Sequence, residues 1–315
     1  MKVAVLDDYL DVAKGLADWQ SLGAEVVFFK DYIAPDKLAT ALEPFDVVVA
    51  MRERSRFPAE LIKALPNLKL LITTGLRNAA IDMQACAAAG VVVSAAPGDD
   101  LGGGGTAELA WALAMALFKR IPQEAQNMRE GLWQTAMTPV LAGKRLGLVG
   151  AGKLGQLVAK YGKAFDMEVV AWSPNLTDER AAQAGVKRVD KLELFATSDI
   201  ISLNLVLSDR TAGIVDAECI AAMKPNGYLV NTSRAGLIDL AALKAALEQG
   251  RIGGAGLDVF DVEPLPADDE WRLVPNVIMT PHLGYANTEN FEAYFPHAVQ
   301  AIAAWQSGEP IRVLT

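Results

Sequence analysis

The stretch RLGLVGAGKLGQLVAKYGKAFDMEVVAW, residues 145–172, decides the fold. It opens with an apolar run at Leu146–Val149, passes through GAGKLG and then shows apolar residues at helical spacing up to Ala164. A second apolar run, Glu168–Trp172, follows after a short break. Strand, glycine-rich turn, helix and strand in this order predict a βαβ unit with two parallel strands.

In that context the segment GAGKLG matches GxGxxG, the turn that binds a dinucleotide. Gly150 would make the tight turn, Gly152 would let a pyrophosphate approach the backbone, and Gly155 would let helix and strand pack closely. The helix N-terminus, at Lys153 and Leu154, would present free N–H groups and a positive dipole. We therefore expect a Rossmann domain that binds NAD or NADP, rather than a merely structural βα turn.

Coenzyme choice depends on the end of the second strand, where an acidic residue usually holds the adenine ribose. Ser173 occupies this position, in WSPN at 172–175. It carries no charge to repel a 2′-phosphate, and no arginine adjoins it; Arg180 is the nearest cation in sequence. The choice between NAD and NADP stays open, and we expect a weak preference with NADH slightly favoured.

The alternation of short apolar runs and helical patterns extends over the whole chain and predicts parallel sheets covered by helices. The first series of expected strands is Val3–Leu6, Glu25–Phe29, Asp46–Ala50, Leu68–Thr73 and Val91–Ser94, with helices such as Ala59–Leu65 and Asp82–Ala89 between them. The second series is Arg145–Val149, Glu168–Trp172, Ile200–Leu203, Tyr228–Asn231, Ala255–Asp258 and Val277–Met279. The expected fold class is α/β, with two doubly wound parallel-sheet domains, the first flavodoxin-like and the second of the Rossmann type.

Four consecutive glycines, Gly102–Gly105, separate the two series and are expected to form a flexible hinge or linker. Thr106 is expected to cap the apolar helix Ala107–Phe118. The last helical stretch, Glu289–Gln306, is expected to return to the first domain. The substrate domain would then comprise residues 1–98 and 288–315, with the cofactor domain, 99–287, inserted into it.

Composition narrows the class of protein. The net charge of −9 argues against nucleic acid and anionic membrane surfaces as partners. No apolar run reaches the ~20 residues of a membrane span, and the N-terminus does not resemble a signal peptide, so we expect a cytoplasmic protein. Cys86 and Cys219 lie far apart without metal-ligand spacing. We expect them to be small buried hydrophobic residues, and we expect no disulfide or metal site.

Three charged side chains follow three different strands of the second series: Arg234, Glu263 and His282. Ligands of open α/β sheets bind at the carboxyl ends of strands. Histidine suits proton transfer near neutral pH, a carboxylate partner favours its charged form, and arginine can grip a carboxylate with its bidentate fork. These residue types predict a site that binds an acid and moves a proton. His297, in the final helical pattern, is expected to be a structural or surface residue.

Four motifs in order resemble the D-isomer-specific 2-hydroxyacid dehydrogenase family over nearly the whole chain. They are the GxGxxG unit, NTSR at 231–234, GLDVF-x-x-EPLP at 256–266 and TPH-x-G at 280–284. The resemblance implies hydride transfer between NAD(P) and a small 2-oxo or D-2-hydroxy acid. It also implies that Arg234 holds the substrate carboxylate, that His282 is the acid/base, and that Glu263 pairs with His282 and favours its protonated form.

The cofactor site is expected to include Thr106, Ser173, Thr232 and Asp258 besides the glycine-rich turn. The resemblance gives Asp258 a hydrogen bond to the nicotinamide carboxamide. Arg129–Trp133 resembles the dimer arm of the family, so a homodimer through the cofactor domain is expected.

Substrate contacts are expected at Arg52, Leu76 and Arg77 as well as at Arg234 and His282. The segment at 74–78, TGLRN, resembles the family loop whose backbone N–H groups touch the substrate carboxylate, although an arginine replaces the usual glycine at position 77 and an alanine the usual aspartate at 79. The extra positive charge favours a small polar or dicarboxylic 2-oxo acid over a branched aliphatic one. Two alternatives are a non-catalytic NAD(H)-sensing protein, and oxidation of phosphonate or formate on the same scaffold.

Overall fold

The computed structural model describes residues 1–314; Thr315, which the sequence prediction assigns to the first domain, lies outside the described residues. The chain forms two compact units. The first comprises Met1–Gly103 and the chain from Ala286 onward, and the second comprises Gly104–Tyr285. None of the helices in residues 1–314 combines the length and the apolar character needed to cross a membrane.

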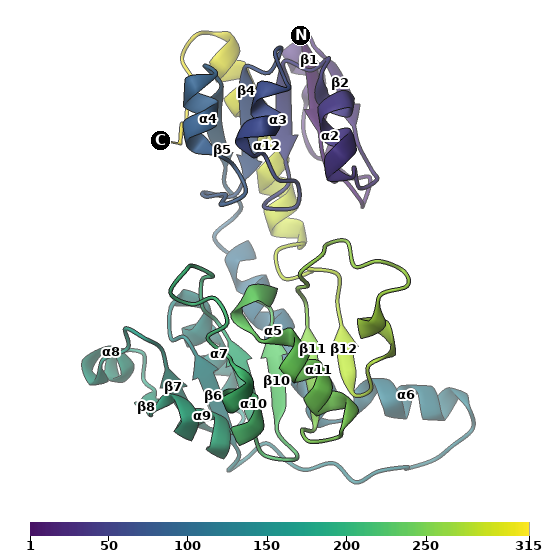
Figure 1. The fold of residues 1–315 in the computed structure, drawn as a ribbon, viewed down its shortest axis with the longest axis vertical. Coiled ribbons are helices and arrows are strands. Elements are labelled where there is room, and N and C mark those ends of the chain that lie inside the picture. The colour runs from purple at the N-terminus through teal and green to yellow at the C-terminus, as the bar shows by residue number, and fades with distance from the viewer. Residues whose placement is uncertain (315) are drawn as a thin grey trace. The chain divides into compact units, whose positions relative to one another are not determined.

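The first unit is built on a five-stranded sheet, drawn in purple to blue in Figure 1. Its strands are β1 (Lys2–Val5), β2 (Glu25–Phe28), β3 (Val47–Ala50), β4 (Leu70–Thr74) and β5 (Val92–Ala96). All neighbours pair in parallel in the order β2-β1-β3-β4-β5. This is the doubly wound flavodoxin-like order, as predicted.

Helices cover both faces of this sheet. They are α1 (Ala13–Leu16), η1 (Trp19–Leu22), α2 (Pro35–Leu42), α3 (Ala59–Lys63), α4 (Met83–Ala88) and α12 (Thr288–Gln306). Buried residues of α2, α3 and α4 share one apolar cluster with strand residues such as Val48 and Leu71. The last helix, α12, contacts β4, β5, α1 and η1 on the opposite face (Figure 1). The chain end therefore completes the first unit.

The second unit contains a seven-stranded parallel sheet with the order β12-β11-β10-β9-β6-β7-β8. Its strands are β6 (Arg145–Val149), β7 (Glu168–Trp172), β8 (Lys187–Arg188), β9 (Ile200–Leu203), β10 (Tyr228–Asn231), β11 (Gly254–Leu257) and β12 (Val277–Met279). The order reverses between β6 and β9, as in a Rossmann fold. The predicted fold class is thereby confirmed.

Layers of helices bury both faces of this sheet. The helices are α5 (Gly105–Phe118), α6 (Ile121–Arg129), α7 (Lys153–Ala164), α8 (Asp178–Gln183), α9 (Lys191–Thr197), α10 (Ala217–Ala222), η3 (Ala235–Leu237), α11 (Leu240–Glu248) and η4 (Glu270–Leu273). In β9, Ile200 joins the apolar cluster of α5 and α7, whereas Ile201 joins the cluster of α9, α10 and α11. Two buried faces explain why the strands appear in the sequence as continuous apolar runs.

The glycine run is folded, contrary to the expectation of a loose linker. Gly102–Gly104 form a 3₁₀ turn, η2, that continues into α5. The carbonyl of Gly102 accepts the side-chain amides of Asn287 and Asn290 at 3.0 and 3.3 Å. A Cβ on Gly102 would lie 2.3 Å from Asn290 Oδ1, so the glycine allows this close approach. These contacts explain why residues 99–103, expected in the cofactor domain, belong to the first unit.

The prediction that Thr106 caps α5 is wrong. The helix begins at Gly105, so Thr106 lies inside the first turn, and no side chain caps this helix. The Thr106 hydroxyl instead donates to the carbonyl of Gly284 at 2.7 Å. Its role is to tie α5 to the turn after β12.

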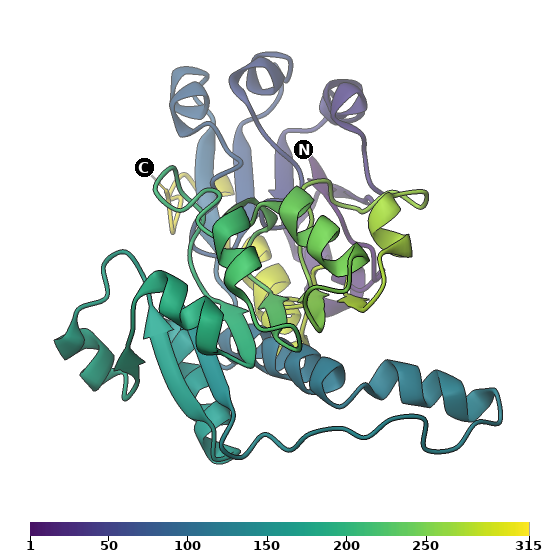
Figure 2. The same ribbon diagram turned by 60° about the horizontal axis from the view of Figure 1, so that its bottom comes forward.

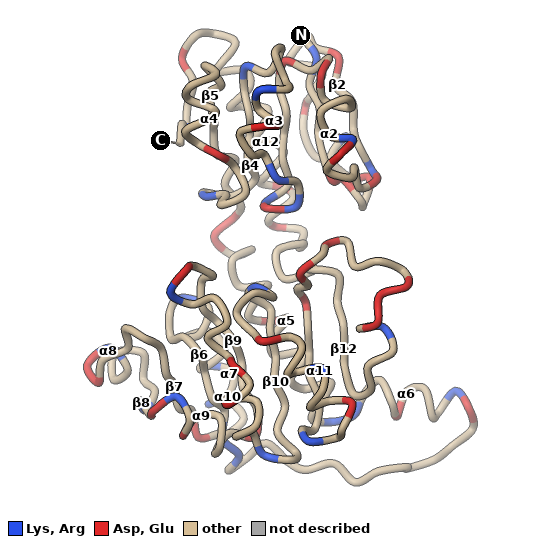
Figure 3. The backbone as a smooth tube through the Cα atoms, viewed as in Figure 1, with Lys and Arg blue, Asp and Glu red and all other residues tan. Residues whose placement is uncertain are grey.

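An arm extends from the second unit, formed by α6 and the loop that returns to β6. Both ribbon views show it standing away from the rest of that unit (Figures 1 and 2). Trp133 is 74% exposed and Met137 is 99% exposed in this loop. Basic and acidic residues are interspersed in both units (Figure 3).

Candidate active site

The glycine-rich turn after β6 has the geometry of a phosphate cradle. Gly150 has a φ of +104°, and a Cβ there would lie 2.8 Å from the carbonyl oxygen of Asn204. A Cβ on Gly155 would lie 2.2 Å from the Gly150 oxygen, so only glycine lets α7 pack against this turn. A Cβ on Gly152 would meet nothing within 4 Å, which leaves open space in front of the N-terminus of α7. The turn therefore has room for a pyrophosphate where a helix N-terminus favours an anion.

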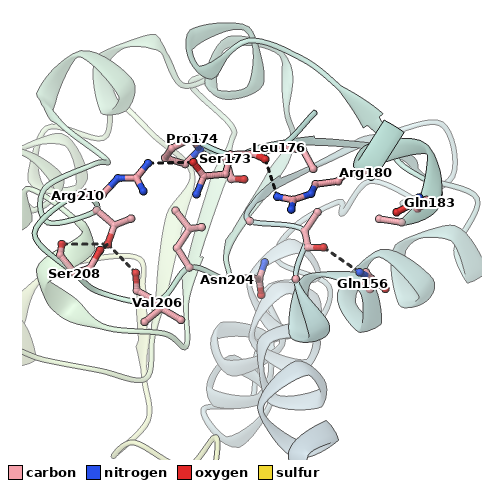
Figure 4. Close-up of a pocket in the computed structure, with 17 residues that line it drawn as sticks. Gln156, Ser173, Pro174, Leu176, Arg180, Gln183, Asn204, Val206, Ser208 and Arg210 are labelled. Carbon is pink, nitrogen blue, oxygen red and sulfur yellow. Dashed lines mark hydrogen bonds between the residues drawn. The ribbon is translucent and has the colours of Figure 1, made fainter. Parts of the chain in front are cut away.

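A cavity of about 730 Å³ opens beside this turn. Most of its lining comes from three loops, which follow β6, β7 and β9, and helices α7 and α8 supply the rest (Figure 4). The cavity thus lies at the point where the strand order reverses, the usual ligand position in open α/β sheets. Its volume falls within the range of small-molecule and cofactor sites. The residues present fit a dinucleotide.

His282 and Glu263 form a close pair at the carboxyl edge of the same sheet. Nδ1 of His282 lies 2.6 Å from Oε2 of Glu263. The other carboxylate oxygen, Oε1, accepts the backbone N–H of Phe260 at 2.9 Å, which orients Glu263. The imidazole also packs edge-on against the ring of Tyr285, with centroids 5.4 Å apart. With Nδ1 engaged by the carboxylate, Nε2 is left for another partner.

Asp258, the first residue after β11, holds the turn that carries His282. Its carboxylate is fully buried. Oδ1 accepts the Thr280 hydroxyl at 2.6 Å and the Leu283 N–H at 2.7 Å, and Oδ2 accepts the Gly284 N–H at 2.9 Å. Burial raises the pKa of this carboxyl, whereas the hydrogen bonds act in the opposite direction. The immediate partners of Asp258 are therefore residues around His282.

Arg234 stands at the end of a tight turn after β10. The buried side chain of Asn231 accepts from the N–H of Ser233 at 3.0 Å and donates to the carbonyl of Arg234 at 2.9 Å. The Ser233 hydroxyl donates to the Leu203 carbonyl at 2.8 Å. These bonds fix the backbone of NTSR, and the half-buried guanidinium of Arg234 donates to the Ser233 carbonyl at 2.7 Å.

The sheet places Arg234, Glu263 and His282 beyond β10, β11 and β12, which are neighbours. All three side chains therefore start from one edge of the second unit. Of the remaining expected cofactor residues, Lys153 is exposed at the start of α7, Leu154 is half-buried and Thr232 is buried after β10.

In the first unit, the expected substrate residues follow β3 and β4, which are also neighbours. Arg52 has a φ of +52°, and its guanidinium lies over Gly75, where a Cβ would come within 2.1 Å of Nη1. Its side chain is hydrogen-bonded to Tyr294, and its Nε lies 3.8 Å from Glu53. Leu76 is 67% exposed, and Arg77 is exposed as well. Arg52 is thus held in place, whereas the tip of the next loop faces solvent.

Sequence reasoning missed three residues that the structure places at these sites. Thr280 and Tyr285 flank His282 and hold its loop and ring. Arg210 lines the cavity beside Ser173. Thr280 lies in the TPH-x-G motif, which marks it, whereas Arg210 lies 35 residues from its partner Asn175 and belongs to no recognisable motif.

Comparison with known proteins decides the family. Residues 111–284 match the sequence model described as D-isomer specific 2-hydroxyacid dehydrogenase, NAD binding domain. The chain belongs to this family. The matched range lies within the second unit, which is therefore its NAD-binding domain.

Relatives with curated names support the assignment to this family. The chain is 34% identical over 291 residues to D-3-phosphoglycerate dehydrogenase of Archaeoglobus fulgidus, covering 92% of this chain and 54% of that protein. It is 36% identical over 270 residues to hydroxypyruvate reductase of Thermotoga maritima, covering 84% and 86%. The chain thus spans about half the length of the D-3-phosphoglycerate dehydrogenase but most of the reductase.

A solved structure agrees over the entire fold. The crystal structure described as phosphoglycerate oxidoreductase from Vibrio cholerae O395 superposes with a TM-score of 0.91 at 36% identity. The match covers 98% of this chain and 99% of the other. Family and fold are therefore established by independent comparisons.

Proposed function

We propose that the protein is an NAD(P)-dependent D-2-hydroxyacid dehydrogenase, which interconverts a small 2-oxo acid and its D-2-hydroxy acid. The observation that carries the proposal is the Glu263–His282 pair, 2.6 Å apart, at the sheet edge that also carries Arg234. An imidazole with a carboxylate behind it can move a proton, and a guanidinium can hold a carboxylate. A Glu–His pair with a purely structural role would not require Arg234 after the neighbouring strand β10.

In the direction of reduction, a nicotinamide held by the glycine-rich turn would supply the hydride that the substrate carbonyl carbon accepts. His282 donates a proton from Nε2 to the carbonyl oxygen as the C=O π bond breaks, so that a hydroxyl forms. The Glu263 carboxylate, 2.6 Å from Nδ1, orients the imidazole for that transfer. Arg234 binds the substrate carboxylate and stabilises negative charge as it develops on the oxygen, an electrostatic contribution that is often the largest in such sites.

We assign coenzyme binding to Gly150, Gly152 and Gly155, with the N–H groups of Lys153 and Leu154. The open space at Gly152 supports this assignment. Further coenzyme contacts are proposed at Thr106, Ser173, Thr232 and Asp258. Asp258 has three donors from the protein, so a contact with the nicotinamide carboxamide would use its remaining acceptor capacity.

We assign substrate recognition in the first unit to Arg52, Leu76 and Arg77. Arg52 and Arg77 each carry a positive charge, in addition to the guanidinium of Arg234 in the second unit, which would by itself bind one carboxylate. A 2-oxo acid with a second anionic or strongly polar group is therefore the proposed substrate class, with hydroxypyruvate, glyoxylate and dicarboxylic 2-oxo acids as examples. The name of the Thermotoga relative, hydroxypyruvate reductase, is consistent with this class.

The test is a panel of 2-oxo acids assayed with NADH and with NADPH, following coenzyme absorbance. Reduction of hydroxypyruvate, glyoxylate or a dicarboxylic acid at a higher kcat/KM than a branched aliphatic acid supports the proposal. Coenzyme binding without turnover of any acid would favour an NAD(H)-sensing protein instead. Oxidation of phosphonate or formate with NAD or NADP would favour the other alternative.

We also propose that two copies associate through the arm of α6 and the following loop. Exposed apolar side chains concentrate there: Ile121, Met128, Leu132, Trp133, Met137 and Val140. An apolar arm of this kind is stable when a second surface covers it. Light scattering should give a dimer for the native chain and a monomer for Trp133→Glu with Met137→Glu. A native monomer at micromolar concentration would contradict this assignment.

A further inference from the structure

The cavity beside the glycine-rich turn carries positive charge. Two arginines line it, Arg180 from α8 and Arg210 from the loop after β9 (Figure 4). No aspartate or glutamate occurs among its lining residues. The site therefore lacks the carboxylate that would pair with a ribose 2′-hydroxyl and repel a phosphate in its place.

Both guanidinium groups converge on one residue of the loop after β7. Nη1 of Arg180 donates to the backbone carbonyl of Asn175 at 3.3 Å, and Nη2 of Arg210 donates to the Oδ1 of Asn175 at 3.0 Å. Figure 4 shows the two side chains approaching this loop from opposite sides, with Ser173 between them. Ser173 is the residue at which the adenine ribose is expected in a Rossmann domain.

Arg180 and Arg210 differ from the nearby Arg188 in that neither forms an ion pair with a carboxylate among the described residues. Arg188 in β8 pairs with Asp178 at 3.6 Å. Within residues 1–314, no ion pair joins a carboxylate to Arg180 or to Arg210. Each guanidinium uses one donor on Asn175 and has further donors that a ligand could engage.

We infer that Arg180, Arg210 and Ser173 form a binding site for the 2′-phosphate of NADP(H), so that the enzyme prefers NADPH to NADH. This inference rests on the proposed function, because it concerns the coenzyme of that reaction. It replaces the weak NADH preference expected from the sequence, where Arg210 could not be associated with Ser173. Arginine is the side chain best suited to a phosphate, because its planar fork matches the phosphate oxygens.

Binding of coenzymes and of their adenosine fragments tests the inference without turnover. Titration calorimetry with the full chain would measure Kd for NADPH, NADH, adenosine 2′,5′-bisphosphate and 5′-AMP. Since a hydrogen bond to a charged group is worth roughly tenfold or more in affinity, we expect NADPH to bind at least about tenfold tighter than NADH. The bisphosphate should exceed 5′-AMP by a similar ratio.

The ratio of NADPH affinity to NADH affinity should depend on salt concentration and on pH. The preference should shrink as salt rises, because the interaction is between charges near the surface. It should also shrink below about pH 6, where a phosphate monoester takes up its second proton.

Variants separate the phosphate site from the rest of the coenzyme site. Arg180→Ala and Arg210→Ala should each weaken NADPH binding by roughly tenfold, and the double variant by more, with NADH affected less than about threefold. Arg188→Ala is the matched control, because it removes the same charge from the adjacent strand and should leave the NADPH/NADH ratio unchanged. Ser173→Asp should reverse the preference toward NADH, since its carboxylate would repel the phosphate.

The outcomes distinguish this inference from the proposed function. NADH binding as tightly as NADPH, or a ratio unchanged in the double arginine variant, would overturn the phosphate site and leave the dehydrogenase proposal standing. Failure of the native chain to bind either coenzyme would overturn both.

Discussion

Oε2 of Glu263 lies 2.6 Å from Nδ1 of His282, while Oε1 of the same carboxylate accepts the N–H of Phe260. The two contacts fix the direction of the carboxylate and, through it, the orientation of the imidazole. In the proposed mechanism, Glu263 is therefore a positioning residue for His282. Its charge and its geometry can be tested separately from the proton transfer itself.

Glu263→Gln keeps the shape of the side chain and removes the charge. We expect the rate of reduction at neutral pH to fall by at least about tenfold, because the imidazolium loses its counter-ion. Asp261→Asn, an exposed neighbour, is the control. A native rate in Glu263→Gln would show that the charge of Glu263 does not support the reaction.

Arg234→Lys tests how the substrate carboxylate is held. A lysine keeps the charge but offers a point ammonium in place of a bidentate fork. We expect a large rise in KM for the best 2-oxo acid together with a lower kcat, and an unchanged Kd for the coenzyme. Arg251→Lys, at an exposed position of the same unit, should behave like the native enzyme. If Arg234→Lys also keeps native steady-state constants, the carboxylate is held elsewhere.

Asp258→Asn tests the support of the catalytic turn. Both carboxylate oxygens accept hydrogen bonds, so an amide NH₂ in place of either oxygen would face a donor from Thr280, Leu283 or Gly284. We expect a loss of about 1–3 kcal/mol in the free energy of unfolding, measured by urea denaturation, and a loss of activity. Asp268→Asn, which alters an exposed carboxylate, should change neither quantity. A fully stable and active Asp258→Asn variant would contradict this role.

Arg77→Gly tests the substrate class. It restores the residue usual in the family and removes one positive charge from the loop after β4. The advantage in kcat/KM of hydroxypyruvate or a dicarboxylic 2-oxo acid over a branched aliphatic acid should decrease. Arg56→Gly removes a charge from another exposed position of the first unit and should leave the ranking intact. An identical ranking in Arg77→Gly would exclude Arg77 from substrate recognition.

The sequence predicts the two sheets well because their strands are buried on both faces. Such strands appear as uninterrupted apolar runs, and the residues just after them, including Arg234 and His282, can be placed at one edge by strand order alone. The two-residue strand β8, Lys187–Arg188, is exposed and has no apolar signal. The sequence analysis gives no bounds for helices α10 and α11, although the capping residues Asp216 and Asp239 mark their starts.

Other features depend on contacts between residues far apart in the sequence. Arg210 reaches Asn175 only because β9 and β7 lie on either side of β6 in the sheet. Threonine is a residue type that often caps helices, but the Thr106 hydroxyl donates to the carbonyl of Gly284, 178 residues away. In the sequence Gly102 resembles part of a linker, but in the structure Asn287 and Asn290 at the start of α12 lie close against it. Local sequence patterns contain none of this information.

The most direct test of the central claim is His282→Ala, with turnover and coenzyme binding measured on the same preparation. General acid–base catalysis contributes roughly two to four decades in rate, so kcat for the best 2-oxo acid should fall by that amount. Coenzyme Kd should stay within about threefold of the native value, because the glycine-rich turn and the cavity beside it are untouched. Near-native turnover in His282→Ala would contradict the assignment of His282 as the proton donor and, with it, the proposed mechanism.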